Sequence, residues 1–164
     1  MQRILGIDPG LRLTGYGCVA LADGELDATL VEAGVLRLDP KLSLPQRLAQ
    51  LHADLDALIA ELEPHHMVVE QLYAHYRHPR TAILMAHARG VILLCGQQRG
   101  LTVAHLPSTE VKKAVTGYGH ASKLQMQRAV AGQLGMAEPP SPPDVADALA
   151  IALTHARRLA EQAL

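Results

Sequence analysis

The chain has 164 residues, and 49% of them are hydrophobic, which is enough for the core of one ordinary domain, so we expect a single domain over residues 1–164. No stretch approaches the roughly 18 uninterrupted apolar residues of a membrane helix, and because the N-terminal apolar run is short and interrupted by Asp8, we expect no signal peptide. A net charge of −1 by itself argues against a nucleic-acid partner.

The first forty residues have the pattern of three strands. A buried strand is expected over residues 3–7, and it ends at Asp8-Pro9-Gly10, a sequence typical of a turn. A second strand is expected over residues 14–21 and a third over residues 29–38, with Asp23-Gly24 as the turn between them. Together they predict an antiparallel meander.

Helices and strands alternate over the rest of the chain. Ser43-Leu44-Pro45 opens a long amphipathic helix that Pro64 ends. Two further strands are expected, over residues 66–70 and 101–105. The remaining helices are expected over residues 80–99, from Pro107-Ser108 to a break at residues 117–120, over residues 122–134, and onward from residues 139–143. The expected architecture is an α/β domain with a mixed five-stranded sheet and helices on both faces.

The two cysteines, Cys18 and Cys95, lie within apolar runs. We expect them to be buried free thiols in a reducing compartment rather than a disulfide. A cytoplasmic location is therefore expected.

Charge is distributed unevenly along the chain. Residues 1–70 carry −6, residues 71–137 carry +7, and residues 138–164 carry −2. The bases of the central block are Arg77, Arg80, Arg89, Arg99, Lys112, Lys113, Lys123 and Arg128. Such a block could bind a polyanion by counterion release, although on charge alone a solvated charged face is the simpler explanation.

Two of the expected strands end in a carboxylate. Asp8 and Glu70 each follow a run of apolar residues. A turn is the simpler explanation for Asp8 alone, and an exposed strand end accounts for Glu70, although glutamate has poor strand propensity. If the two strands are neighbours, both carboxylates emerge at the edge where open α/β sheets place active sites.

Asp144 and Asp147 are three residues apart and therefore share one face of the last helix. Ser141 is the expected N-cap, with Asp144 reaching back from the first turn, and this accounts for Asp144. It does not account for Asp147, whose neighbours are Val, Ala, Leu and Ile. An ionised carboxylate there costs on the order of several kcal/mol unless a cation or hydrogen-bond donors compensate.

Carboxylates without cysteine ligands favour Mg²⁺ or Mn²⁺ over zinc. Two such ions held about 3.5–4 Å apart hydrolyse phosphodiesters, because one activates water and the other neutralises the leaving 3′ oxygen. If the carboxylates converge, the pattern therefore predicts a metal-dependent phosphoryl hydrolase.

The same residues, in this order, resemble the RuvC family of Holliday-junction resolvases, within the RNase H-like nuclease superfamily. The similarity spans roughly residues 4–155 and rests on an ordered set of short motifs. They are Gly6-Ile7-Asp8-Pro9-Gly10, Thr14-Gly15-Tyr16-Gly17, Val69-Glu70-Gln71, Ala88-Arg89-Gly90, Val111-Lys112 with Gly117 and Gly119, and Asp147-Ala148-Leu149-Ala150-Ile151-Ala152 with Thr154-His155. The resemblance implies an RNase H-like fold and an endonuclease that resolves four-way DNA junctions by symmetric, metal-dependent hydrolysis in recombination and repair, leaving 5′-phosphate and 3′-hydroxyl ends.

Residue by residue, the resemblance implies a catalytic set that binds two Mg²⁺ ions, for which Mn²⁺ substitutes. That set is Asp8, Glu70, Asp144 and Asp147. It also implies a catalytic lysine, Lys123, which with Lys112 lies near the scissile phosphate; without the resemblance both are simply exposed helical lysines. The other expected DNA-binding residues are Arg77, Arg80 and Lys113.

Tyr73 occupies a position where the family carries an aromatic side chain that stacks on an unpaired base at the crossover. The loop that follows, residues 74–80, is about one residue longer than usual and richer in His and Arg. Either Tyr73 or Tyr76 could therefore be the stacking residue.

The resemblance also implies partners. The family acts as a homodimer whose two-fold symmetry matches that of the junction, and it works with the RuvA–RuvB branch-migration complex. The helix expected over residues 80–99 carries more apolar residues than one face needs, so we expect it to contribute to the dimer contact.

Three other interpretations remain open at this stage. An actin-like ATPase shares the meander and the opening Asp-x-Gly, but its two lobes need far more than 164 residues. A structure-selective DNA-binding module would use the basic block alone and leaves Asp147 unexplained. A related RNA-processing nuclease would be distinguished by its cleavage of structured RNA.

Overall fold

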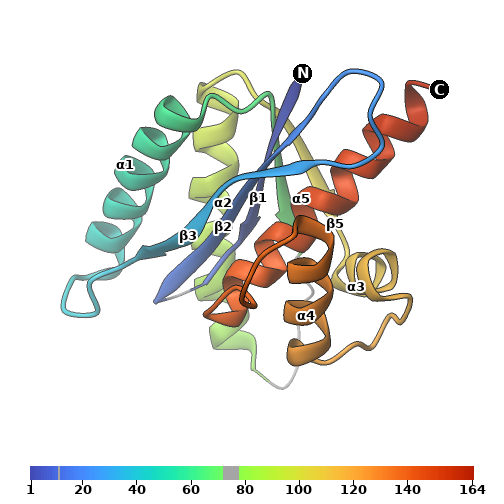
Figure 1. Cartoon of the computed structure of the whole chain (residues 1–164). Coiled ribbons are helices and arrows are strands. Elements are labelled where there is room, and N and C mark those ends of the chain that lie inside the picture. The colour runs from blue at the N-terminus through green and yellow to red at the C-terminus, as the bar shows by residue number, and fades with distance from the viewer. Residues whose placement is uncertain (11, 72–77) are drawn as a thin grey trace.

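The computed structural model describes residues 1–10, 12–71 and 78–164. A five-stranded mixed sheet lies between two layers of helices (Figure 1). Its strands are β1 (Gln2–Asp8), β2 (Leu13–Leu21), β3 (Thr29–Arg37), β4 (His66–Glu70) and β5 (Thr102–Leu106). They lie in the order β3-β2-β1-β4-β5; the first three pair antiparallel, whereas β4 is parallel to β1 and β5 is parallel to β4. The predicted meander and mixed sheet are confirmed.

The helices cover both faces of the sheet. They are α1 (Leu44–Leu62), α2 (Pro79–Gln98), α3 (Ser108–Thr116), α4 (Lys123–Leu134) and α5 (Pro143–Gln162). One face is covered by α1 and α2 and the other by α5, with α3 and α4 packed against it (Figure 1). The predicted α/β architecture is therefore confirmed as well.

β1 is buried on both sides, which explains its continuous apolar run. Successive residues of a strand point to opposite faces. Accordingly, Ile4 packs in the core beneath α5, whereas Leu5 and Ile7 pack in the core beneath α1 and α2.

Local sequence explains where most helices begin and end. α1 starts at a capping box in which Ser43 and Gln46 satisfy each other's backbone N–H groups, and α4 starts at the same arrangement of Ser122 and Gln125. Gly117 ends α3 with a φ of 82°, a left-handed conformation that favours glycine. The predicted break between these two helices is confirmed.

The predicted cap of the last helix is wrong. The N-cap of α5 is Pro142, not Ser141, and its side chain accepts no hydrogen bond. The reason is that Pro143 takes the first helical position, which suits its restricted φ and missing N–H. Asp144 nevertheless lies in the first turn, as expected.

α5 lies directly on β1 and β2 because glycines face it. A Cβ atom at Gly6 would collide with the carbonyl oxygen of Ala148, and one at Gly15 would collide with the carbonyl oxygen of Asp144. The start of the helix is therefore held over the carboxyl end of β1.

Cys18 and Cys95 are both buried free thiols, which confirms their expected state. Within the described residues, none of the helices has the length and apolar character needed to cross a membrane.

Candidate active site

Asp8 and Glu70 end neighbouring strands. Because β1 and β4 are parallel and Ile7 pairs with Val69, the two carboxyl groups emerge side by side at the carboxyl edge of the sheet. They share a side-chain hydrogen bond. The juxtaposition expected from the strand pattern is therefore present.

α5 brings the other two carboxylates to the same edge. Gly15, which is paired with Asp8 across β1 and β2, lies against the backbone of Asp144. The charges of Asp144 and Asp147 both raise the pKa of Asp8, so both lie near it. Asp147 is one turn further along the same face of the helix. The structure thus gathers all four predicted carboxylates.

The crowding perturbs their ionisation. Burial, and then the neighbouring carboxylates, raise the pKa of Asp8 to about 9. Burial is also the main reason why the pKa of Asp147 rises to about 6, with Glu70 and Asp144 adding to it. Without a cation, Asp8 therefore keeps its proton at neutral pH.

Two of the predicted lysines lie near this cluster. The positive charges of Lys112 in α3 and Lys123 at the start of α4 both lower the pKa of Asp147, in opposition to burial. A small cavity of about 70 Å³ separates α3 from the carboxylates. Its lining comprises Glu70, Ser108, Val111, Lys112, Met126, Asp147 and Ile151. A phosphate that entered this cavity would meet an ammonium group and two carboxylates.

The cluster has the chemistry that a hard divalent cation requires, since every donor is a carboxylate oxygen. Within the described residues, no three His, Cys, Asp or Glu side chains converge closely enough to coordinate one ion together. Mg²⁺ usually takes only one or two protein carboxylates and completes its shell with water and substrate phosphate. A pair such as Asp8 and Glu70 satisfies that requirement.

The remaining predicted residues are less closely tied to the carboxylates. Lys113, in the last turn of α3, and Arg80, in the first turn of α2, are exposed and do not line the small cavity. Tyr73, Tyr76 and Arg77 lie outside the described residues. His120 is exposed, whereas His155 is half-buried with its Nε2 3.4 Å from Nδ1 of His66.

Arg89 makes a contact at this edge that the sequence did not predict. Its Nε donates a hydrogen bond of 3.3 Å to the backbone carbonyl oxygen of Glu70. The only sequence signal was its place in the motif Ala88-Arg89-Gly90, which does not indicate what the side chain contacts.

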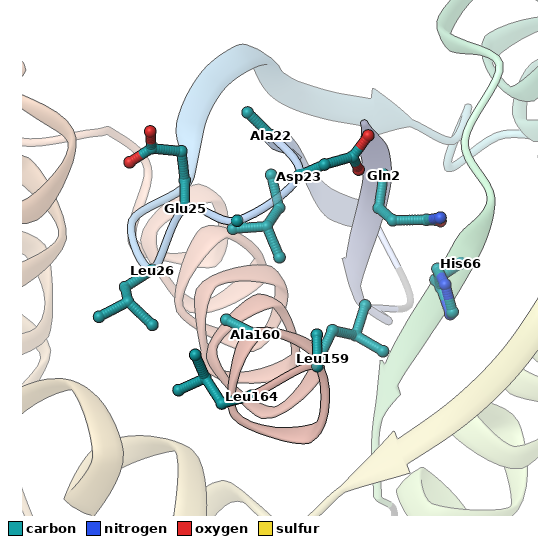
Figure 2. Close-up of a pocket in the computed structure, with 12 residues that line it drawn as sticks. Gln2, Ala22, Asp23, Glu25, Leu26, His66, Leu159, Ala160 and Leu164 are labelled. Carbon is teal, nitrogen blue, oxygen red and sulfur yellow. The ribbon is translucent and has the colours of Figure 1, made fainter.

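A cavity of about 350 Å³ lies at the opposite end of the sheet. Figure 2 shows Gln2, His66, the turn around Asp23 and the end of α5 around it. It contains none of the predicted site residues, so it is separate from the carboxylate cluster.

Comparison with known proteins identifies this arrangement. The five-stranded mixed sheet with helices on both faces is an RNase H-like resolvase fold. The structure of Thermus thermophilus RuvC has a TM-score of 0.86 with this chain at 34% sequence identity, covering 98% of this chain and 97% of the other. The same protein in complex with a Holliday junction substrate has a TM-score of 0.89, covering 99% and 98%.

Sequence comparison agrees. Residues 4–155 match the family model described as "Crossover junction endodeoxyribonuclease RuvC". A protein of that description from Rhodopirellula baltica is 48% identical over 150 residues, covering 92% of this chain and 83% of the relative. The chain belongs to the RuvC family. The predicted activity, an endodeoxyribonuclease that resolves Holliday junctions in recombination and repair, is confirmed, and membership implies a dependence on divalent metal ions.

Proposed function

We propose that Asp8, Glu70, Asp144 and Asp147 form the metal-binding catalytic site, and that they hold two Mg²⁺ ions for which Mn²⁺ can substitute. The observation that carries this proposal is the gathering of four carboxylates at one edge, with the pKa of Asp8 raised to about 9. Such mutual repulsion is relieved when cations bind between the groups.

The chain's own residues orient the reaction. When bound, the ions supply the activation of water and the neutralisation of the leaving 3′ oxygen, which gives 5′-phosphate and 3′-hydroxyl ends. Asp8, whose pKa is raised to about 9 by burial and by the neighbouring carboxylates, must lose its proton to become a ligand. Lys112 lines the cavity beside Asp147 and can hold the phosphate, and Lys123 offsets negative charge that develops on it.

The substrate is a four-way DNA junction. Thermus thermophilus RuvC, which is 34% identical to this chain, has been solved with a Holliday junction substrate. We assign DNA contacts to Arg80, Lys112, Lys113 and Lys123, which belong to the basic block of residues 71–137. Tyr73 and Arg77 complete the proposed set, with Tyr73 or Tyr76 stacking at the crossover.

The active assembly is a homodimer of single-domain chains over residues 1–164, in which each site nicks one of two opposed strands. α2 supports this proposal, because the side chains of Ile83 and Leu94 are 61% and 52% exposed. We further propose that the dimer works with the RuvA–RuvB complex in the cytoplasm.

A nicking assay on a synthetic four-way junction tests the metal site. With Mg²⁺ or Mn²⁺ we expect paired nicks that EDTA abolishes. Asp8→Asn and Glu70→Gln should each lower the cleavage rate by at least about 100-fold, since each removes a charged ligand, while junction affinity stays within about threefold.

Asp27→Asn is the matched control, because Asp27 is exposed in the turn at the opposite end of the sheet. It should cleave like the wild type. Wild-type rates in both Asp8→Asn and Glu70→Gln would refute the proposed roles.

A further inference from the structure

Arg89, in the middle of α2, connects three elements near the carboxylate edge. Its Nε donates to the backbone carbonyl oxygen of Glu70 at 3.3 Å, and its Nη2 lies 2.5 Å from Nδ1 of His105 in β5. Burial and the charge of Arg89 lower the pKa of His105, so the ring is neutral and its Nδ1 can accept. The guanidinium therefore bridges α2 to the ends of β4 and β5.

These contacts hold the backbone of Glu70. The same peptide group is held from its other side, because the N–H of Gln71 donates to the carbonyl oxygen of Leu106 at 2.8 Å. β4 ends at Glu70, so these two bonds fix the last peptide of the strand. The direction in which the Glu70 side chain leaves the backbone is thereby restricted.

Arg89 also approaches the segment after Asp8. A cavity of about 30 Å³ is lined by Pro9, Glu70, Gln71, Met85 and Arg89. The side chain of Arg89 thus lies beneath the ends of both strands that carry a proposed ligand.

The arginine acts through geometry rather than through its charge. The charges that shift the pKa values of Asp8 and Asp147 are those of the carboxylates and of Lys112 and Lys123. Arg89 meets Glu70 at the backbone oxygen, not at the carboxylate. It therefore does not compete with a cation for the ligand oxygens.

We propose that Arg89 is a positioning residue of the metal site, which anchors the backbone of Glu70 so that its carboxylate faces Asp8. This inference rests on the proposed function, because it requires Glu70 to be a ligand. Outer partners of metal ligands commonly change metal affinity by about 10–100-fold when they are removed.

The test is a titration of metal-free protein with Mn²⁺, in which electron paramagnetic resonance measures the free ion. Arg89→Gln should raise the Kd for Mn²⁺ by about tenfold. Arg89→Lys keeps the charge but cannot make both bonds of the guanidinium fork, so it should raise the Kd as well. If Arg89→Gln does not fold, the Kd of Arg89→Lys for Mn²⁺ provides the test.

Arg99→Gln is the matched control. Arg99 is the C-cap residue of α2, and its guanidinium donates two hydrogen bonds of 2.5 and 2.6 Å to Asp56. Its loss removes a comparable pair of bonds from the same helix without touching Glu70. We expect the Kd for Mn²⁺ to be unchanged.

Glu70→Gln distinguishes a failure of the proposed metal site from a failure of the proposed role of Arg89. If it binds Mn²⁺ as the wild type does, the proposed metal site itself is wrong. If it binds Mn²⁺ weakly while both Arg89 variants bind it normally, only the role of Arg89 is overturned.

Junction cleavage gives a second readout. The Arg89 variants should cleave about 10–100-fold more slowly at limiting Mn²⁺, recover at saturating Mn²⁺, and keep their junction affinity within about threefold. A loss of junction affinity that matches the loss of rate would make Arg89 a DNA contact and overturn the positioning role.

Discussion

At Asp8, folding opposes ionisation. Burial and three neighbouring carboxylates raise the pKa of Asp8 to about 9 from an ordinary value of 3.8. Between these two values the folded, metal-free chain keeps a proton that the unfolded chain has released. The free energy of unfolding therefore falls as the pH rises through this window. The residue that is central to the proposed site destabilises the metal-free fold.

Asp8→Asn should relieve this destabilisation. Asparagine cannot ionise, and its amide can still donate to Glu70, so the metal-free variant should be more stable than the wild type at pH 8. We expect a gain on the order of 2 kcal/mol, or a melting temperature higher by about 4–8 °C, that shrinks towards pH 4. Calorimetry in EDTA measures it, and a difference that does not change between pH 4 and pH 8 would contradict this explanation.

The sequence indicated which carboxylates are candidates for the proposed site, but not the contacts around them. Asp8 and Glu70 stood out because a carboxylate at the end of an apolar strand is unusual, and Asp147 because its sequence neighbours are all apolar. Nothing of this kind marks Arg89, since its partner is a backbone oxygen on another element, and a backbone oxygen has no sequence signature.

At the scale of elements, the prediction succeeded where local sequence determines structure. Ser43 and Ser122 begin helices through capping boxes, and Gly117 ends one in a left-handed conformation. It failed at the start of α5, where consecutive prolines moved the N-cap to Pro142. The sequence also could not show that Gly6 and Gly15 allow α5 to pack closely on the sheet, because such close packing depends on the tertiary structure.

Gly15→Ala tests whether this close approach positions Asp144. The added methyl group would overlap the backbone of Asp144, so the start of α5 must move away from β2. We expect junction cleavage to fall by at least about tenfold, because catalytic groups tolerate little displacement.

Gly132→Ala is the control for this substitution, since an added methyl group there meets no atom within 4 Å. In the last turn of α4 it should stabilise the protein by up to about 1 kcal/mol and leave cleavage unchanged. Equal cleavage rates for Gly15→Ala and Gly132→Ala would show that junction cleavage does not depend on how closely α5 packs against β2.

At the scale of the whole molecule, topology creates the site. Asp8 and Glu70 are far apart in sequence, and they meet only because β4 inserts next to β1 in the sheet. Lys112 and Lys123 of the basic block lie at the same edge, where their charges lower the pKa of Asp147, and Lys112 lines a cavity with Glu70. A net charge of −1 therefore hides a local arrangement of opposite charges suited to a metal ion and a phosphate.

The proposed homodimer makes a prediction at this scale. Replacing both Ile83 and Leu94 with Asp places two charges on the exposed apolar surface of α2. If that surface forms the dimer contact, the wild type should sediment as a dimer at micromolar concentration and the double variant as a monomer. A monomeric wild type that still cleaves junctions fully would contradict the dimer.

Anomalous diffraction from crystals grown with Mn²⁺ would locate the ions that the carboxylates bind. The proposed site predicts two manganese peaks about 3.5–4 Å apart at the carboxylate edge, with ligands drawn from Asp8, Glu70, Asp144 and Asp147. Manganese bound only elsewhere, with these four side chains free of metal at saturating concentration, would contradict it.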